Sequence, residues 1–302
     1  MSHLVNLRCL SFSRGIHIPN IGRLKWLQML QCFCVIKGRG HELRQLKDLN
    51  KLEGCLCLTN LENVESKEEA VEASLAVKER LTELKLCWRD NASCSPEVEE
   101  EVLEGLCPPK SLSILNIHGY NGSTYPNWMV SKQKGGPMNL RNLWLNSCRQ
   151  LEPAPEIFEV FVHLRCFRLW FSNWNALPDN MELLTSLQVL DIHTCLNIHS
   201  LPALPRSLES FNLLNCNEKF MRSCQTIDDP NWQKIQHIPK KGIVSDYGSH
   251  PSPSLSNTSF QVISAYHIFE VHNLETITAE QCRSFIGARH PGLMERDEVE
   301  FH

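Results

Sequence analysis

The sequence of 302 residues predicts an α/β repeat protein, a solenoid built from short parallel strands. Three observations predict it. An apolar string recurs through most of the chain, its copies keep a narrow spacing, and each copy alternates apolar and polar residues as an extended strand does. We therefore expect a curved parallel sheet on a concave face, with irregular arms and short helices on the convex face.

The recurring string is L-x-x-L-x-L, with isoleucine or phenylalanine in some copies, and it is fullest in residues 140–151 and 187–198. A single copy cannot bury its aliphatic ridge alone, so each has to stack on its neighbours. The intervals between copies fall mostly within the ~20–29 residues of leucine-rich repeats, and they predict a leucine-rich-repeat solenoid. The last apolar residues of successive strand cores are Leu58, Leu86, Ile117, Leu145, Leu169, Ile192 and Leu213.

A cysteine follows three of these strand cores, at Cys148, Cys195 and Cys216. The chain is expected to turn inward there, and a thiol is small enough to fill the space beside buried backbone groups. The sequence holds 14 cysteines without the dense framework of a disulfide-stapled fold, so we expect free thiols. Their spacing is not that of a zinc site, and we expect no bound metal.

The first of two insertions in the repeats covers about residues 65–81. Ser66 and Glu69 form a capping box, which marks the start of a helix. Val71, Leu75 and Leu81 follow at helical spacing. The pattern predicts one helix that carries these three residues.

The second insertion covers about residues 95–107. Pro96 suits the first position of a helix, and the acidic residues within 97–101 suit the positive end of a helix dipole. We expect this acidic run to be a solvated convex surface, with a basic partner as the alternative.

The domain organisation follows from where the repeats stop. Residues 1–240 are predicted to form the solenoid, and residues 241–302 a C-terminal tail. Within the tail, about residues 245–259 are polar and rich in proline and serine, as in a linker. The sequence assigns no role to residues 260–302.

Charge and hydropathy exclude several classes of partner. With 34 acidic and 30 basic residues the net charge is −4, which gives no reason to expect nucleic acid or an anionic membrane surface. No run of about 18 apolar residues predicts a membrane-spanning helix, and the start of the chain lacks the pattern of a secretory signal. We therefore expect a cytoplasmic protein.

Candidate binding residues lie between the buried leucines of each strand, because alternation turns them to the concave face. Trp144, Arg168 and Trp170 are the strongest candidates, since they fall on adjacent strands and since tryptophan and arginine are enriched at interface hot spots. The predicted protein-binding residues are Lys85, Arg89, Asn116, His118, Trp144, Asn146, Arg168, Trp170, Asp191 and His193.

A catalytic function is not expected. His118 and His193 are three strands apart, which is roughly 14 Å at the usual strand spacing, too far to share a proton or a metal. The sequence contains no nucleophile elbow, no pair of catalytic carboxylates and no G-x-x-x-x-G-K-[ST] loop for a nucleotide phosphate. We expect no cofactor.

Several strings resemble a known family. Residues 21–28 are similar to an "I-G-x-L-x-x-L-Q" junction, residues 119–128 to a "G-Y-x-G-x-x-x-P-x-W" repeat, and residues 232–239 to a "W-x-K-I-x-H-I-P" ending. All three occur in plant NB-LRR disease-resistance proteins of the coiled-coil subclass. The resemblance covers about residues 1–240 and implies the leucine-rich-repeat region of such a receptor.

That resemblance also implies partners. In this family the repeats sense pathogen effectors or guarded host proteins, and they fold back on a nucleotide-binding switch domain. The chain carries no P-loop and begins inside the array, so we expect a truncated gene, a partial gene model or a separated repeat fragment. ADP or ATP binding is not expected of it.

Two other functions stay open at the level of sequence. A substrate-recognition subunit of a ubiquitin ligase also uses leucine-rich repeats, although no F-box is visible here. An extracellular receptor fragment would fit the N-x-S/T sequons at Asn91, Asn121 and Asn257. The L-x-G-x-I-P repeat of such ectodomains is absent from the sequence.

Overall fold

The computed structural model describes residues 7–10, 18–38, 40–89 and 94–245. The chain forms two units, and the described residues all belong to the first, Met1–Ser11 with His17–Ser249. From residue 246 on, the expected linker and tail lie outside the described residues.

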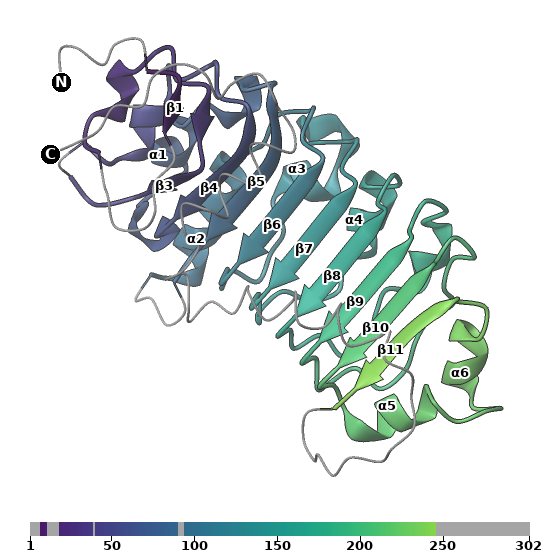
Figure 1. Ribbon diagram of the computed structural model, residues 1–302. Helices are drawn as coiled ribbons and strands as arrows, with labels where there is room; N and C mark the ends of the chain where they lie inside the picture. Colours follow the sequence, from purple (N-terminus) through teal and green to yellow (C-terminus); the bar gives the residue numbers. More distant parts are fainter. Residues whose placement is uncertain (1–6, 11–17, 39, 90–93, 246–302) are drawn as a thin grey trace, which may run out of the picture. The chain divides into compact units, whose positions relative to one another are not determined.

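Within the described residues, nine parallel strands form one sheet in which each strand pairs with that of the next repeat (Figure 1). This order confirms the predicted leucine-rich-repeat solenoid. The strands are β3 (Cys32–Cys34), β4 (Gly54–Thr59), β5 (Leu81–Cys87), β6 (Ile114–His118), β7 (Asn142–Asn146), β8 (Cys166–Trp170), β9 (Val189–His193), β10 (Ser210–Leu214) and β11 (Lys240–Val244). A separate parallel pair joins β1 (Cys9–Leu10) to β2 (Met29–Leu30).

The core is a continuous ladder of aliphatic side chains. Leu86, Ile117, Leu145, Leu169 and Ile192 pair in register across β5 to β9. Each is at most 1% exposed. Burying one such side chain contributes about 1.5–3 kcal/mol, so the ladder stabilises neighbouring repeats jointly rather than singly.

Each repeat from β6 to β10 turns at the same position, directly after its strand. Gly119, Ser147, Phe171, Thr194 and Asn215 all have left-handed backbone, with φ between 50° and 72°. Left-handed backbone suits glycine and asparagine, and it is unusual for a bulky side chain.

The cysteines after the strands occupy the predicted inward turns. The Cys148 thiol lies 3.5 Å from the carbonyl oxygens of both Ile117 and Asn146, so it contacts its own strand and the preceding one. Cys195 and Cys216 make equivalent contacts. The expectation that these thiols fill space beside backbone groups is confirmed.

The first insertion is not one helix. Ser66 caps α1 (Lys67–Val71) by accepting a hydrogen bond from the Glu69 backbone N–H, as the capping box predicts. The helix ends at Val71, because Ser74 adopts left-handed backbone before the 3₁₀ turn η4 (Leu75–Val77). The prediction of one helix through Val71, Leu75 and Leu81 is therefore wrong: Val71 ends α1 and is exposed, Leu75 is buried in η4, and Leu81 begins β5.

In the second insertion the acidic side chains bind the chain itself. The α2 helix (Pro96–Gly105) turns Glu99 inward, where its carboxylate accepts the backbone N–H of Asn121 at 2.7 Å. Glu100 accepts the backbone N–H of Ser123 at 2.8 Å. The solvated surface expected for this acidic run is therefore wrong for Glu99 and Glu100, because the next repeat's loop folds over them.

The same loop is held at its far end. Glu104 accepts the backbone N–H of Asn127, and the indole N–H of Trp128 donates to the Leu103 carbonyl in the buried interior. The G-Y-x-G-x-x-x-P-x-W string is thus a loop that hydrogen bonds fix to α2.

The remaining helical segments fill the arms of the repeats (Figure 1). These helical segments are η1 (Ile21–Arg23), η2 (Leu43–Leu46), η3 (Leu61–Asn63), α3 (Asn127–Val130), η5 (Lys132–Lys134), α4 (Pro155–Val160), η6 (Asp179–Leu183), α5 (Glu218–Ser223) and α6 (Pro230–Ile235).

The sheet continues to Val244, beyond the expected solenoid end at residue 240, because main-chain pairing does not require the leucine pattern.

Candidate protein-binding face

The residues that alternate with the buried leucines form parallel rows on the other face of the sheet, and two of these rows hold most of the predicted binding residues. Strand register places them side by side, one residue per strand in each row. The middle row is Lys85, Asn116, Trp144, Arg168, Asp191 and Asn212, and the end row is Cys87, His118, Asn146, Trp170, His193 and Leu214.

A chain of contacts fixes the Trp144 ring across four strands. The Arg168 guanidinium carbon lies 4.5 Å from the centre of that ring. Arg168 Nε lies 2.9 Å from Asp191 Oδ2, and Asn212 Nδ2 donates to Asp191 Oδ1 at 2.6 Å. Because Asp191 is only 6% exposed, water screens this ion pair poorly, and the arginine is held in place over the tryptophan.

Aromatic rings continue along the end row. Trp170 and His193 meet edge to face, with ring centres 5.8 Å apart. Phe171 also packs on His193 at 5.2 Å. Sequence reasoning missed Phe171 because it follows the strand. The left-handed backbone that brings its ring to His193 is shared by the other repeats at this position and has no signal in the residue pattern.

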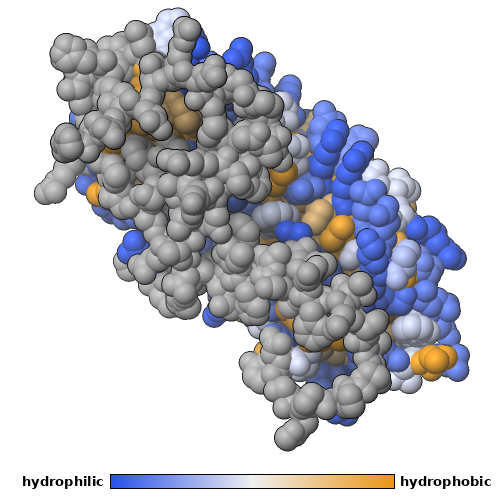
Figure 2. All heavy atoms as spheres, viewed as in Figure 1, coloured by the Kyte–Doolittle hydropathy of each residue, from blue (hydrophilic) through white to orange (hydrophobic). Residues whose placement is uncertain are grey.

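A shallow hollow of about 20 Å³, room for roughly one water molecule, lies in the middle of these rows. We call it the aromatic hollow. Figure 2 shows hydrophobic residues lying between hydrophilic ones over the visible part of the described surface. The aromatic hollow is lined by Asn116, Trp144, Leu145, Asn146, Arg168 and Trp170.

The structure thus brings together most of the predicted binding residues. Asp191 and His193 lie outside the lining of the aromatic hollow but contact residues that line it. Asp191 pairs with Arg168, and the ring of His193 packs on that of Trp170. His118 is buried beside Asn146, with 8% exposure. Their role in binding stays a prediction, which rests on this geometry.

Two predicted residues lie apart from the aromatic hollow. Lys85 is in register with Asn116 and forms an ion pair with Glu83 at 3.3 Å. Arg89 follows the end of β5 and pairs with Glu62 at 3.6 Å.

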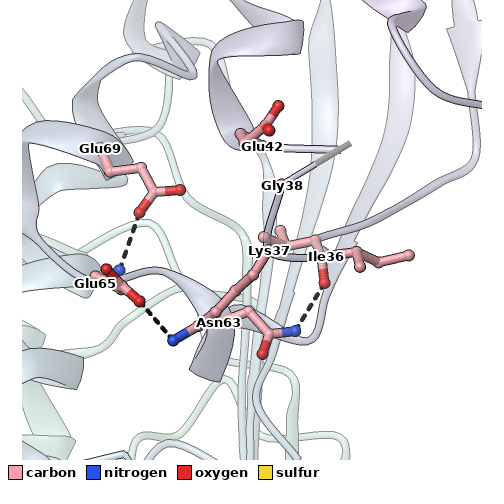
Figure 3. A pocket seen from close by; sticks show the side chains of 8 residues that line it. Ile36, Lys37, Gly38, Glu42, Asn63, Glu65 and Glu69 are labelled. Atoms are coloured by element: carbon pink, nitrogen blue, oxygen red, sulfur yellow. Dashed lines mark hydrogen bonds and ion pairs between the residues drawn. The ribbon is translucent and has the colours of Figure 1, made fainter. Parts of the chain in front are cut away.

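A second hollow of about 140 Å³ lies near the N-terminal repeats (Figure 3). Its acidic side chains are engaged within the chain. Glu65 pairs with Lys37 at 2.5 Å, and Glu69 accepts the Glu65 backbone N–H. The hydrogen bond and charge of Lys37 lower the pKa of Glu65. The carboxylates of Glu65 and Glu69 therefore hold neighbouring segments of the chain together.

Thiols replace aromatic rings on the face of β3 to β5. Cys32 is in register with Cys57, and their hydrogen bond raises the pKa of Cys32. Burial raises the pKa of Cys55 to about 11. Such thiols stay protonated near neutral pH and are poor nucleophiles. Among the residues with described positions, no three His, Cys, Asp or Glu side chains are grouped to hold a metal ion.

In the described part of the chain, no helix has the length and apolar character needed to cross a membrane. The helices there run to ten residues at most.

Comparison with known proteins identifies a leucine-rich-repeat region. Residues 43–172 match the model of the R13L1/DRL21 leucine-rich repeats. These are the residues that carry both insertions and the first strands of the aromatic face. Over this segment the chain is a leucine-rich-repeat region.

The curated relatives are plant disease resistance proteins. The chain is 35% identical over 139 residues to putative disease resistance protein RGA1 of Solanum bulbocastanum, covering 46% of this chain and 14% of that protein. It is 38% identical over 109 residues to disease resistance protein RGA2 of the same species, covering 36% and 11%. The predicted resemblance is confirmed: the matched segment is similar to these plant disease resistance proteins and to the R13L1/DRL21 leucine-rich repeats.

A third relative is putative disease resistance RPP13-like protein 1 of Arabidopsis thaliana, 34% identical over 136 residues, covering 42% of this chain and 13% of that protein. The matches with these relatives span about one seventh of their length or less. Among solved structures, the crystal structure of a TLR13–ssRNA13 complex matches with a TM-score of 0.38 and 16% identity, over 80% of this chain and 44% of that one.

Proposed function

We propose that this chain is the protein-recognition module of a plant immune receptor, and that it binds a pathogen effector or a guarded host protein in the cytoplasm. It acts by binding rather than by catalysis. Support comes from the disease-resistance relatives and from a sheet face that carries large side chains while its leucines build the core.

One observation carries the proposal. Trp144, Arg168 and Trp170 lie on two adjacent strands, and Asp191 and Asn212 hold the arginine in place from the next two. Tryptophan and arginine dominate interface hot spots, because they bury a large area at little cost in side-chain freedom. Pre-positioned side chains lose still less freedom on binding.

The test compares proteins captured from pathogen-infected leaf extract. The baits are the wild-type chain, Trp144→Ala/Trp170→Ala, and the control Trp26→Ala, whose exposed ring lies outside the aromatic hollow. The proposal expects a partner whose capture falls at least tenfold with the double variant only, and which binds the purified wild-type chain directly. Equal capture by all three folded baits would exclude the proposed face.

A further inference from the structure

Two exposed arginines lie side by side at the edge of the sheet where β7 and β8 begin. Arg141 and Arg165 immediately precede these strands, and the Arg165 backbone N–H donates to the Arg141 carbonyl at 2.7 Å. Adjacent parallel strands are about 4.8 Å apart, so the two side chains leave neighbouring points of the backbone. Among the residues that the structure describes, neither guanidinium group has an ion pair or a hydrogen bond.

Other polar residues along this edge have partners within the chain. Hydrogen bonds between successive backbones place Gln188 and Glu209 in line with the two arginines, and Gln188 Nε2 donates to Glu209 Oε1 at 3.3 Å. Toward the N-terminus, Arg80 pairs with Glu53 at 3.9 Å. At the start of β7 and β8 both positions are instead positive. Like charges at this spacing repel each other, and a carboxylate placed between them would relieve that repulsion.

An exposed apolar side chain lies three residues before each arginine. Met138 is 43% exposed and Val162 is 40% exposed. They occupy equivalent turns, residues 137–140 and 161–164, which are each closed by a backbone hydrogen bond of 3.1 Å. The same spacing in two successive repeats puts two apolar and two positive side chains on one edge. We call Met138, Arg141, Val162 and Arg165 together the basic edge.

The basic edge is complementary to an acidic segment that also carries apolar side chains. A guanidinium group donates two parallel hydrogen bonds to a carboxylate, which adds direction to the attraction between the charges. Exposed methionine and valine side chains are favoured when another apolar surface covers them. Single-stranded nucleic acid binds instead to basic grooves lined with aromatic rings on which its bases stack. The aliphatic side chains therefore favour a protein.

Resting on the proposed function, we propose that the basic edge binds an acidic segment of the partner protein. Carboxylates of that segment pair with Arg141 and Arg165, and its apolar side chains cover Met138 and Val162. Because Arg141 precedes Trp144 by three residues, about 10 Å along a strand, one partner can contact both the basic edge and the aromatic face.

Short peptides test this inference without the natural partner. The probes are the acetylated amides of Leu-Glu-Leu-Glu, Leu-Gln-Leu-Gln and Leu-Lys-Leu-Lys, and fluorescence anisotropy of their labelled forms gives the dissociation constants. Labelling the chain with ¹⁵N-arginine locates the binding, since single substitutions assign the side-chain N–H signals. We expect saturable shifts of Arg141 and Arg165 with the glutamate peptide, which should bind at least fivefold more tightly than the other two and more weakly as salt rises.

Matched variants separate the arginine pair from overall charge. Arg141→Gln/Arg165→Gln should weaken the glutamate peptide to the level of the glutamine peptide. The control Arg149→Gln/Lys219→Gln removes two exposed positive charges outside the basic edge and should leave binding unchanged. Equal weakening by both double variants would mean that net charge alone attracts the peptide, and it would overturn the inference.

The apolar part of the basic edge is tested separately. Met138→Ser/Val162→Ser should weaken both the glutamate and the glutamine peptide several-fold. Equal binding of the three peptides, or tighter binding of a single-stranded hexanucleotide than of the glutamate peptide, would also overturn the inference. If that happened while Trp144→Ala/Trp170→Ala still lowered partner capture, the proposed function would stand. Selective binding of the glutamate peptide with equal partner capture by all baits would instead exclude only the proposed aromatic face.

Discussion

The repeats of β3 to β5 and those of β6 to β10 share one core but differ in their outer face. Both stack in-register leucines and isoleucines that are almost fully buried. On the face, β3 and β4 carry thiols such as Cys32 and Cys57, whereas β7 and β8 carry Trp144, Arg168 and Trp170. The inward positions therefore determine the fold, whereas the outward positions differ in chemistry from one repeat to another.

The largest effect should come from charging the shared core. Leu145→Asp puts a carboxylate where the side chain is 1% exposed, and it should lower the free energy of unfolding by more than about 4 kcal/mol. Its neighbour Trp144→Ala, on the outer face, should cost about 1 kcal/mol or less. Urea unfolding followed by circular dichroism measures both. Similar losses for the two variants would contradict the division between core and face.

Alkaline pH should destabilise the C-terminal repeats through their buried thiols. Burial raises the pKa of Cys216 to about 11 and of Cys195 to about 12, from an ordinary value of 9.0. Because the folded pKa is the higher one, this stability is fully present below pH 9 and is lost as pH rises toward 11–12. Over that window the loss is roughly 3 kcal/mol for Cys216 and roughly 4 kcal/mol for Cys195.

Lys78 works in the opposite direction in the N-terminal repeats, since burial lowers its pKa to about 8. Its folded form is less readily protonated than its unfolded form, so it adds stability between pH 8 and its ordinary pKa of 10.5. The thiols outnumber it, and the urea midpoint should therefore fall above pH 9. Cys195→Ala with Cys216→Ala should flatten that fall, and an unchanged slope would contradict the assignment.

A smaller effect is expected from removing the contact between α2 and the loop of the next repeat. Glu99→Ala leaves the Asn121 N–H without its acceptor and should cost about 1–3 kcal/mol. Glu97→Ala, on the exposed side of α2, is the matched control and should change stability by less than about 0.5 kcal/mol. Thermal unfolding compares the two, and equal melting temperatures would show that the carboxylate does not hold the loop.

The strands could be predicted from the sequence because their signal is local. Alternation within five residues places Leu143 and Leu145 inward and Trp144 outward, and parallel stacking then brings Trp144 beside Arg168. The sequence could not show which charges are satisfied by distant segments. Glu99 looked like a solvated helix residue, because its partner Asn121 lies in the next repeat.

Two further features are set by the neighbouring repeat and not by the local residue pattern. Phe171 joins the aromatic cluster through a left-handed backbone that no side-chain periodicity reveals. The strand β11 is formed by main-chain pairing with β10, although its residues Lys240–Val244 lack the leucine pattern. In both cases the conformation depends on the neighbouring repeat.

The most direct test of the central claim is to change each outer face in turn and measure partner capture at equal stability. Trp144→Ala/Trp170→Ala alters the face of β7 and β8, and Cys57→Ser/Cys87→Ser alters that of β4 and β5. We predict that both variants remain folded and that only the tryptophan variant loses the partner, by at least tenfold. Loss of the partner with the cysteine variant, and retention with the tryptophan variant, would contradict the claim that recognition resides on β7 and β8.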